Sequence, residues 1–237
     1  MYGFALLVAV SFFLFHVNQK RRAAQPVSAR PVTRAEVLGD AGEAIVDAEL
    51  RRVLTWLCGE NFYLHAGAVV LHHAPGTDYP TAEIDHLAIT PFGLFVFETK
   101  NWTGRIEPGP DVDTLTRIAA DGTRDDRKSP IRQNRSKLAF LRSVLPGMWP
   151  VSGYGAFASA GCVLSPALPP TLICLADLSH QLRLCKTHYE STGQRPVNVA
   201  LAWRAVLSVA QTSPSAVAEH RCRVQTSDKS RHAFSSR

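Results

Sequence analysis

Apolar residues along this chain repeat with two spacings, one typical of strands and the other typical of helices. Residues 84–100 contain two apolar runs rich in β-branched and aromatic side chains, separated by a Pro/Gly break at residues 91–93. This pattern predicts a buried β-hairpin. Charged side chains interrupt it at Asp85, Glu98 and Lys100. Ionised groups are rarely buried unless they are paired or bind a metal, so these three positions require partners inside the fold.

The geometry of a strand brings these charges together. Glu98 and Lys100 are two residues apart, so their side chains point to the same face of the strand. A turn centred near residues 92–93 brings Asp85 across from the same region. If Asp85 lies opposite Glu98 or Lys100, all three share a face, whereas a slip of one residue turns Asp85 to the other face. Two carboxylates and a lysine on one patch are typical of a site that binds a hard divalent metal beside a water-orienting cation.

A long amphipathic helix is predicted from Thr33, a suitable N-cap, to about Leu57. Its apolar stripe contains Val46, Leu50, Val53 and Leu57, and Glu43 lies at the head of this stripe. Glu43 could be a solvated acid of the first turns. The nearby Gly39 and Gly42 let another part of the chain approach closely, which favours an inward position for Glu43.

The rest of the pattern alternates short strands with helices, which predicts an α/β fold. Strands are expected at residues 62–72, 105–106, 114–118, 153–164 and 171–175, and helices at residues 138–145, 176–189 and 197–210. Together with the hairpin and the first helix they form one domain at residues 33–210. After residue 210 the composition turns to Ser, His and Arg, so residues 211–237 are expected to be a disordered polar tail.

A basic segment precedes the helix at residues 138–145. Ser129 is suited to cap a helix that has Pro130 at its first position. Arg132, Gln133 and Arg135 then lie in the first helical turns, where free backbone amides favour phosphate. A solvated charged face explains the same residues equally well.

The N-terminal segment has the pattern of a membrane anchor. Residues 2–17 are almost wholly apolar and are followed by three basic residues at 20–22. The run is shorter than the ~20 residues that span a bilayer comfortably, but snorkelling of the basic side chains and local thinning of the bilayer make up the difference. A secretory signal carries its positive charges before the apolar run, so an anchor is favoured over a cleaved signal. We therefore expect a single-pass cell-membrane protein with its N-terminus outside, a transmembrane helix at residues 1–19, a basic linker at residues 20–32 and a cytoplasmic C-terminal domain.

Length and composition narrow the choice of partner. The chain has 237 residues and a formal net charge of +6 at pH 7. The length suits one good-sized domain with additions. The positive charge fits an anionic partner such as nucleic acid or an acidic membrane surface. The cysteines form no C-x-x-C pair, so neither a zinc knuckle nor a redox motif is indicated, and we expect reduced thiols.

Four short motifs, taken in order, resemble a known family. They are G-E at residues 42–43, E-I-D-H at 83–86, F-E-T-K-N-W-T-G at 97–104 and S-P-I-R-Q-N at 129–134. The ordered set is similar to the nuclease-related domain (NERD), a branch of the PD-(D/E)XK nuclease-like superfamily, over residues 36–145. The resemblance implies a restriction-endonuclease-like mixed β-sheet flanked by helices.

The resemblance also implies roles for individual residues. Asp85 and Glu98 would bind Mg²⁺ or Mn²⁺, Glu43 would support the metal or its water, and Lys100 would position the attacking water. Gln133 would be a polar site residue on the following helix, and Arg132 and Arg135 would contact the nucleic-acid backbone. Trp102 could stack on a base, although a position in the core or at its rim is favoured.

The expected activity is therefore hydrolysis of phosphodiester bonds in nucleic acid, with DNA as the first choice, by a membrane-anchored and divalent-metal-dependent nuclease. One alternative is a nucleic-acid-binding or membrane-associated interaction module that keeps the fold without catalysis. The other alternative is purely structural, with Glu98 and Lys100 as a buried ion pair.

Overall fold

The computed structural model describes residues 33–235 of the chain, and within them the side chains of residue 33 and of residues 37–226. The predicted anchor at residues 1–19 and the linker at residues 20–32 lie outside the described residues. In the part of the chain that is described, no helix is both long and apolar enough to cross a bilayer.

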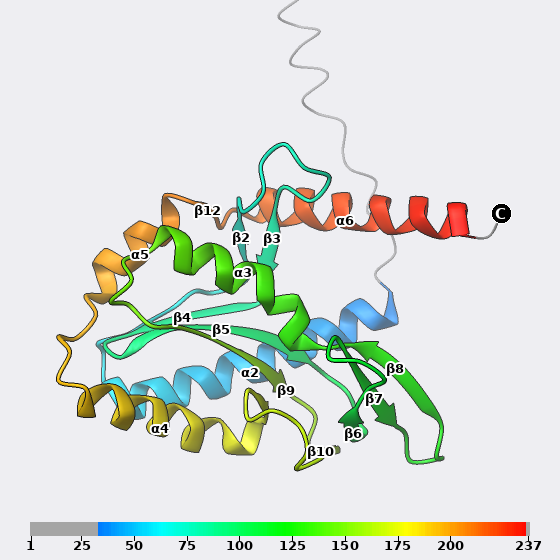
Figure 1. Ribbon diagram of the computed structural model, residues 1–237, viewed down its shortest axis with the longest axis horizontal. Helices are drawn as coiled ribbons and strands as arrows, with labels where there is room; N and C mark the ends of the chain where they lie inside the picture. Colours follow the sequence, from blue (N-terminus) through cyan, green and yellow to red (C-terminus); the bar gives the residue numbers. More distant parts are fainter. Residues whose placement is uncertain (1–32, 236–237) are drawn as a thin grey trace, which may run out of the picture. The chain divides into compact units, whose positions relative to one another are not determined.

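The described residues form a mixed α/β fold in which sheets are flanked by helices (Figure 1), as the sequence predicts. The central sheet has the order β1 (Tyr63–Leu64), β4 (His86–Thr90), β5 (Gly93–Lys100), β9 (Val151–Phe157) and β11 (Leu172–Cys174). Strands β1, β4 and β5 pair antiparallel, while β9 runs parallel to β5 and β11 runs parallel to β9. This sheet is therefore mixed.

The described residues also contain two smaller sheets, separate from the central one. The first has the order β10 (Cys162–Leu164), β6 (Gly104–Pro108), β7 (Thr114–Ile118) and β8 (Arg124–Lys128). The second has the order β12 (Ala210–Gln211), β2 (Val69–Leu71) and β3 (Ala82–Ile84). The strand predicted at residues 114–118 is confirmed as β7, and β8 pairs with it antiparallel across the turn at Gly122.

Helices cover both faces of the central sheet. In Figure 1, α2 (Arg34–Cys58) and α4 (Leu178–Ser191) lie on one side, and α3 (Pro130–Val144) and α5 (Val199–Leu207) lie on the other. A 3₁₀ turn, η1 (Leu175–Asp177), leads into α4. The predicted stripe of α2 is confirmed because Val46, Leu50 and Val53 are fully buried. Of the two glycines near its start, Gly42 touches another segment: a Cβ there would lie 2.8 Å from Cβ of Asn101.

The predicted hairpin is confirmed, and its register is the one that unites the charges. Strands β4 and β5 flank a turn at Pro91 and Phe92, and His86 pairs with Phe97. Asp85, one residue before β4, therefore stands opposite Glu98, one residue after Phe97.

The last residue of the motif at residues 97–104 is a glycine that the backbone requires. Gly104 has a φ of +97°, and a Cβ there would lie 2.2 Å from the carbonyl oxygen of Ile118. Only glycine fits this junction between β5 and β6.

The structure differs from the sequence pattern in two predicted strands. Residues 62–72 form β1 and β2, which belong to different sheets, because the chain turns at Gly67 with a φ of +100°. Residues 153–164 likewise divide between β9 and β10. A run of strand-forming residues does not reveal that the chain changes sheets within it.

The C-terminal segment also differs from expectation. Instead of a disordered tail after residue 210, residues Pro214–Ser235 form a helix, α6, that packs along β2 and β3. Arg221 of α6 pairs with Glu83 of β3, and His220 and Arg223 both contact Oγ1 of Thr81. Composition predicts disorder here because the segment has no continuous apolar stripe, whereas the structure docks it through charged and hydrogen-bonding side chains.

Candidate active site

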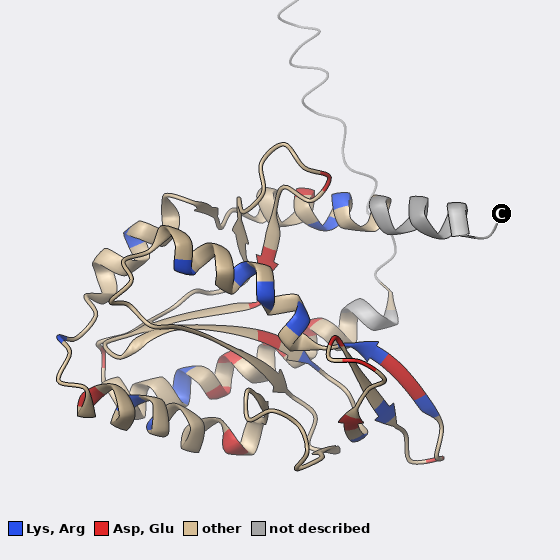
Figure 2. Ribbon diagram, in the orientation of Figure 1, with Lys and Arg blue, Asp and Glu red and all other residues tan. Residues whose placement is uncertain are grey.

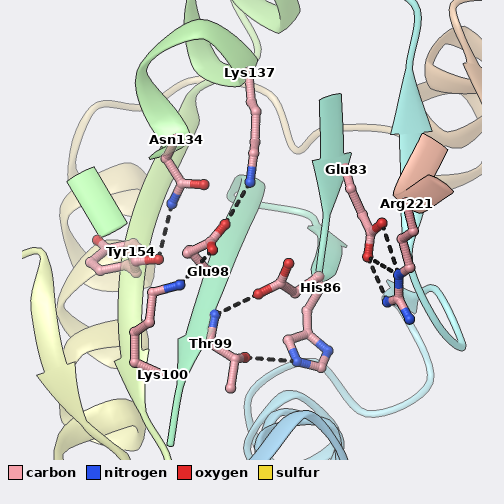
Figure 3. Close-up of polar contacts among 10 residues, drawn as sticks. Glu83, His86, Glu98, Thr99, Lys100, Asn134, Lys137, Tyr154 and Arg221 are labelled. Carbon is pink, nitrogen blue, oxygen red and sulfur yellow. Dashed lines mark hydrogen bonds and ion pairs between the residues drawn. The ribbon is translucent and has the colours of Figure 1, made fainter. Parts of the chain in front are cut away.

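Asp85 and Glu98 come together where the β4–β5 hairpin ends. The backbone N–H of Thr99 donates to Oδ2 of Asp85 at 2.7 Å, which holds this carboxylate beside β5. The side chain of Thr99 points away from Glu98 and meets Nε2 of His86 at 3.0 Å (Figure 3). Strand alternation therefore places the two carboxylates on one face and the His86–Thr99 pair on the other.

Glu98 is bound by two lysines. Nζ of Lys100 donates to Oε1 at 2.7 Å, and Nζ of Lys137 donates to Oε2 at 2.6 Å (Figure 3). The Glu98 and Lys137 side chains are each 7% exposed, and that of Lys100 is 15% exposed. Each carboxylate oxygen of Glu98 thus has its own ammonium group in a site that is largely shielded from water.

The charges of this group affect one another strongly. Burial, followed by the negative charge of Glu98, raises the pKa of Asp85 to about 7. Burial alone would also raise the pKa of Glu98, but the ammonium groups of Lys137 and Lys100 hold it below its ordinary value. The lysines therefore favour the ionised form of Glu98, whereas burial and the charge of Glu98 disfavour the ionised form of Asp85.

A pocket of about 510 Å³ opens above the two carboxylates. Its acidic part consists of Glu83, Asp85 and Glu98, and its basic part consists of Lys128, Arg132 and Lys137. The remaining lining residues are mostly polar or aromatic and include Gln133, Ser136, His73, Tyr79, Thr81 and His220. The pocket therefore combines acidic groups suited to a cation with basic groups suited to an anion.

The start of α3 supplies much of the basic side, as the sequence predicts. Oγ of Ser129 accepts from the backbone N–H of Ile131 at 3.2 Å, with Pro130 at the first helical position. Gln133 and Lys137 are four residues apart and so lie on the same face of α3, toward the pocket. Basic residues recur along α3 and in β8 (Figure 2).

The predicted nucleic-acid contacts have different surroundings. Arg132 lines the pocket, and its Nε lies 3.7 Å from Oδ2 of Asp113. Arg135 is also paired with Asp113, outside the pocket lining. Trp102 packs edge-on against Phe157 at a centroid distance of 5.7 Å, and the Arg127 guanidinium lies 5.0 Å from the centre of its ring. The ring of Trp102 thus packs at the rim of a small apolar cluster that contains Ile106 and Phe157, and it does not line the pocket.

Glu43 is half-buried near the start of α2, beside the acidic part of the site. Burial raises its pKa, the positive charge of Arg221 opposes this, and the charges of Glu83, Asp40 and Glu98 add to it. Glu43 is therefore within electrostatic reach of Glu98, although it does not line the pocket. Glu43 is therefore not the fully solvated acid that one interpretation of the sequence predicts.

Sequence reasoning missed Lys137, Glu83 and His220 as pocket residues. A signal for Lys137 was present, because it lies on the buried stripe of α3 formed with Pro130, Asn134 and Leu141. A lysine on such a stripe needs a carboxylate partner. Glu83 lies within the E-I-D-H motif, whereas no local pattern indicates that His220 reaches the pocket.

Asp85 and Glu98 are suited to a hard divalent cation. Mg²⁺ is commonly bound through one or two carboxylates and keeps several waters. The raised pKa of Asp85 reflects its burial first and the charge of Glu98 second, and a bound cation would offset both by favouring the ionised form. Among the described side chains, no group of three or more His, Cys, Asp or Glu residues is arranged to hold a metal ion. The two facing carboxylates thus fit an ion that completes its coordination with water or substrate oxygen.

Comparison with known proteins gives one match. The family model described as nuclease-related domain (NERD) matches residues 38–158, which include the hairpin, the E-x-K motif and all of α3. No curated protein and no solved structure matches the chain.

Proposed function

Because this chain belongs to the nuclease-related domain family, we propose that it is a divalent-metal-dependent nuclease that hydrolyses phosphodiester bonds of nucleic acid, with DNA as the first substrate to test. The observation that carries the proposal is the position of Asp85 opposite Glu98 in a pocket that also contains Lys128, Arg132 and Lys137. We assign the domain to the restriction-endonuclease-like type on the strength of the family and the mixed central sheet.

Asp85 and Glu98 are the proposed ligands of Mg²⁺ or Mn²⁺, with Glu43 supporting the ion or its water. Such an ion, when bound, polarises the phosphate and lowers the pKa of a coordinated water. Lys100, whose Nζ donates to Oε1 of Glu98 at 2.7 Å, would orient the attacking water or stabilise negative charge that develops on the phosphate. Gln133 supplies a hydrogen-bonding amide, and Arg132 holds the nucleic-acid backbone in position.

Lys137 adds a role that the E-x-K motif does not contain. Its ammonium group keeps Glu98 ionised. It also lines the pocket, where its charge favours the approach of a phosphate. We therefore include Lys137 with Lys100 as a group that supports both the ionised carboxylate and the anionic substrate.

A second candidate is a non-catalytic nucleic-acid-binding module on the same fold. It is favoured by the pairing of both oxygens of Glu98 with lysines, which satisfies this carboxylate without a metal. In that case the basic side of the pocket would hold a phosphate backbone, and the acidic groups would serve only to position the lysines.

The full chain, incubated with plasmid and single-stranded DNA or RNA in Mg²⁺, Mn²⁺ or EDTA, separates the two candidates. The test variants are Asp85→Asn and Lys100→Met, and the matched control is Asp121→Asn, a change to an exposed carboxylate in the turn between β7 and β8, outside the pocket lining. Cleavage that needs a divalent metal and is lost in both test variants supports the nuclease. Retention of nucleic acid without cleavage under every metal condition supports the binding module and contradicts the nuclease.

The site is also proposed to face the cytoplasm from a cell-membrane anchor at residues 1–19. This rests on the apolar run at residues 2–17 and the basic residues that follow it. The full chain should then sediment with membranes after a carbonate wash. A variant lacking residues 1–19 should not, and recovery of the full chain in the soluble fraction would contradict the anchor.

A further inference from the structure

Helix α6 forms part of the proposed active-site pocket, although it lies beyond the region that matches the family. The match ends at residue 158, and α6 begins at Pro214. His220 and Val224 of α6 nevertheless line the same pocket as Asp85 and Glu98. The C-terminal part of the chain, outside the region that matches the family, therefore supplies one wall of the pocket.

The orientation of α6 is fixed by a two-pronged ion pair. Nη2 of Arg221 donates to Oε1 of Glu83 at 2.6 Å, and its Nε lies 3.0 and 3.1 Å from the two carboxylate oxygens (Figure 3). The Glu83 side chain is 14% exposed. A planar guanidinium that meets a carboxylate in this way restricts the direction of approach as well as the distance. The neighbouring His220 is thereby presented at a defined position on α6.

A short hydrogen-bond chain leads from Arg223 through Thr81 to Nδ1 of His220. Nη1 of Arg223 donates to Oγ1 of Thr81 at 3.0 Å, and the same oxygen lies 2.8 Å from Nδ1 of His220. A guanidinium can only donate, so the Thr81 hydroxyl accepts there and its own hydrogen is available to Nδ1. Burial lowers the pKa of His220, so the ring is neutral at pH 7. In the tautomer in which Nδ1 accepts from Thr81, the ring hydrogen lies on Nε2.

The Nε2 group of His220 has no protein partner among the described residues, and the ring lines a pocket that also holds Lys128, Arg132 and Lys137. A neutral N–H in a pocket with three cationic side chains suits an anion that accepts hydrogen bonds. We propose that His220 donates a hydrogen bond from Nε2 to a phosphate oxygen of a nucleic-acid strand lying between α3 and α6. This contact rests on the proposed function and extends the substrate site beyond the matched region of the family.

Binding without catalysis tests the contact directly. The probe is a fluorescent single-stranded oligonucleotide titrated with the full chain in EDTA, at salt concentrations from about 50 to about 200 mM. A hydrogen bond to a charged group predicts that His220→Ala weakens binding about tenfold or more. His220→Gln, which keeps an N–H donor, should recover part of this loss. His188→Ala, which changes an exposed histidine of α4, should bind as the wild type does.

The salt dependence distinguishes a neutral donor from a cation. His220→Ala should leave the slope of log K against log salt unchanged, whereas Arg132→Ala should reduce its magnitude by about one. Thr81→Val should release the tautomer, which is visible in the ¹⁵N shifts of the His220 ring, and should weaken binding less than His220→Ala. If His220 had only a structural role, His220→Ala would lower the melting temperature, but the variants would not show these differences in binding and salt dependence.

The outcomes separate this contact from the proposed function. If the wild type binds the oligonucleotide and both His220→Ala and His220→Gln bind it within twofold of the wild type, the contact is wrong while the nuclease proposal stands. A change of the salt slope by about one in His220→Ala also overturns it, because the ring would then act as a cation. If the wild type neither binds nor cleaves nucleic acid, the proposed function fails and this contact fails with it.

Discussion

Lys137 offers the most direct test of the electrostatics of the site. Its ammonium group lies 2.6 Å from Oε2 of Glu98, with both side chains 7% exposed. Removing one partner of a buried ion pair leaves an uncompensated buried charge and costs about 3–5 kcal/mol. Because Lys100 still binds the other oxygen of Glu98, we expect Lys137→Met to lower the free energy of unfolding by the smaller amount, about 3 kcal/mol.

Equilibrium denaturation in urea, with thermal melting as a second measurement, gives this value. For a chain of this size, about 1 kcal/mol corresponds to about 2–4 °C, so the melting temperature should fall by about 6–12 °C. The destabilisation should shrink at acid pH, since protonation of Glu98 removes the unpaired charge. Adding Glu98→Gln to Lys137→Met should likewise restore part of the loss, which a double-mutant cycle would report as coupling between the two residues.

The matched control lies on the same helix. Arg135 of α3 is 59% exposed and pairs with Asp113 at the surface. Exposed pairs contribute about 0–1 kcal/mol, so Arg135→Met should have little effect on stability. If Lys137→Met were no more destabilising than Arg135→Met, the buried pair with Glu98 and the electrostatic account built on it would be refuted.

Three further changes test other parts of the fold. Burial lowers the pKa of His86 to about 4, so only the unfolded chain takes up this proton as the pH falls below about 6.5. The wild type should therefore lose about 2 kcal/mol of its free energy of unfolding between about pH 7.5 and about pH 5 through this residue. In His86→Gln, urea denaturation should show a loss over the same pH range that is smaller by this amount. Burial and Glu98 raise the pKa of Asp85 to about 7, so stability should fall as the pH rises from about 4 to about 7. Asp85→Asn should abolish that fall and, unlike the wild type, should not be stabilised by Mg²⁺ in thermal melts. Gly104→Ala should cost more than about 2 kcal/mol in the same denaturation assay, because it forces a side chain into a positive φ and against the carbonyl of Ile118; a smaller loss would contradict the predicted overlap.

The parts of the site that sequence reasoning reached are close together along the chain. Asp85 and Glu98 belong to one hairpin, and the short turn at residues 91–93 leaves few registers open. Ser129, Pro130 and Gln133 are likewise local, because a helix cap and a four-residue helical spacing are both readable from neighbouring residues. In both cases the sequence alone contains the geometry that matters.

The parts that it missed depend on contacts between distant segments. Lys137 meets Glu98 across 39 positions, and Arg221 meets Glu83 across 138 positions. Nothing local indicates which of the basic residues of residues 125–137 turns inward, apart from the buried stripe on which Lys137 lies. The docking of α6 is harder still to predict, because polar side chains hold it against β3 and its composition is that of a solvated tail.

The charges at the centre of the site suggest how its two proposed ligands affect one another. When all four groups are ionised, the charges of Asp85 and Glu98 are offset by those of Lys100 and Lys137. A divalent cation bound by the carboxylates would leave an excess of positive charge in a shielded pocket, and a phosphodiester is an anion that offsets it. Each ligand should therefore raise the affinity for the other, and thermodynamic linkage requires the two increases to be equal. Calorimetric titration of Ca²⁺, as a cation that resembles Mg²⁺ in its oxygen ligands, should thus show tighter binding with a single-stranded oligonucleotide present. Equal Ca²⁺ affinities with and without the oligonucleotide would mean that the two ligands do not share this site.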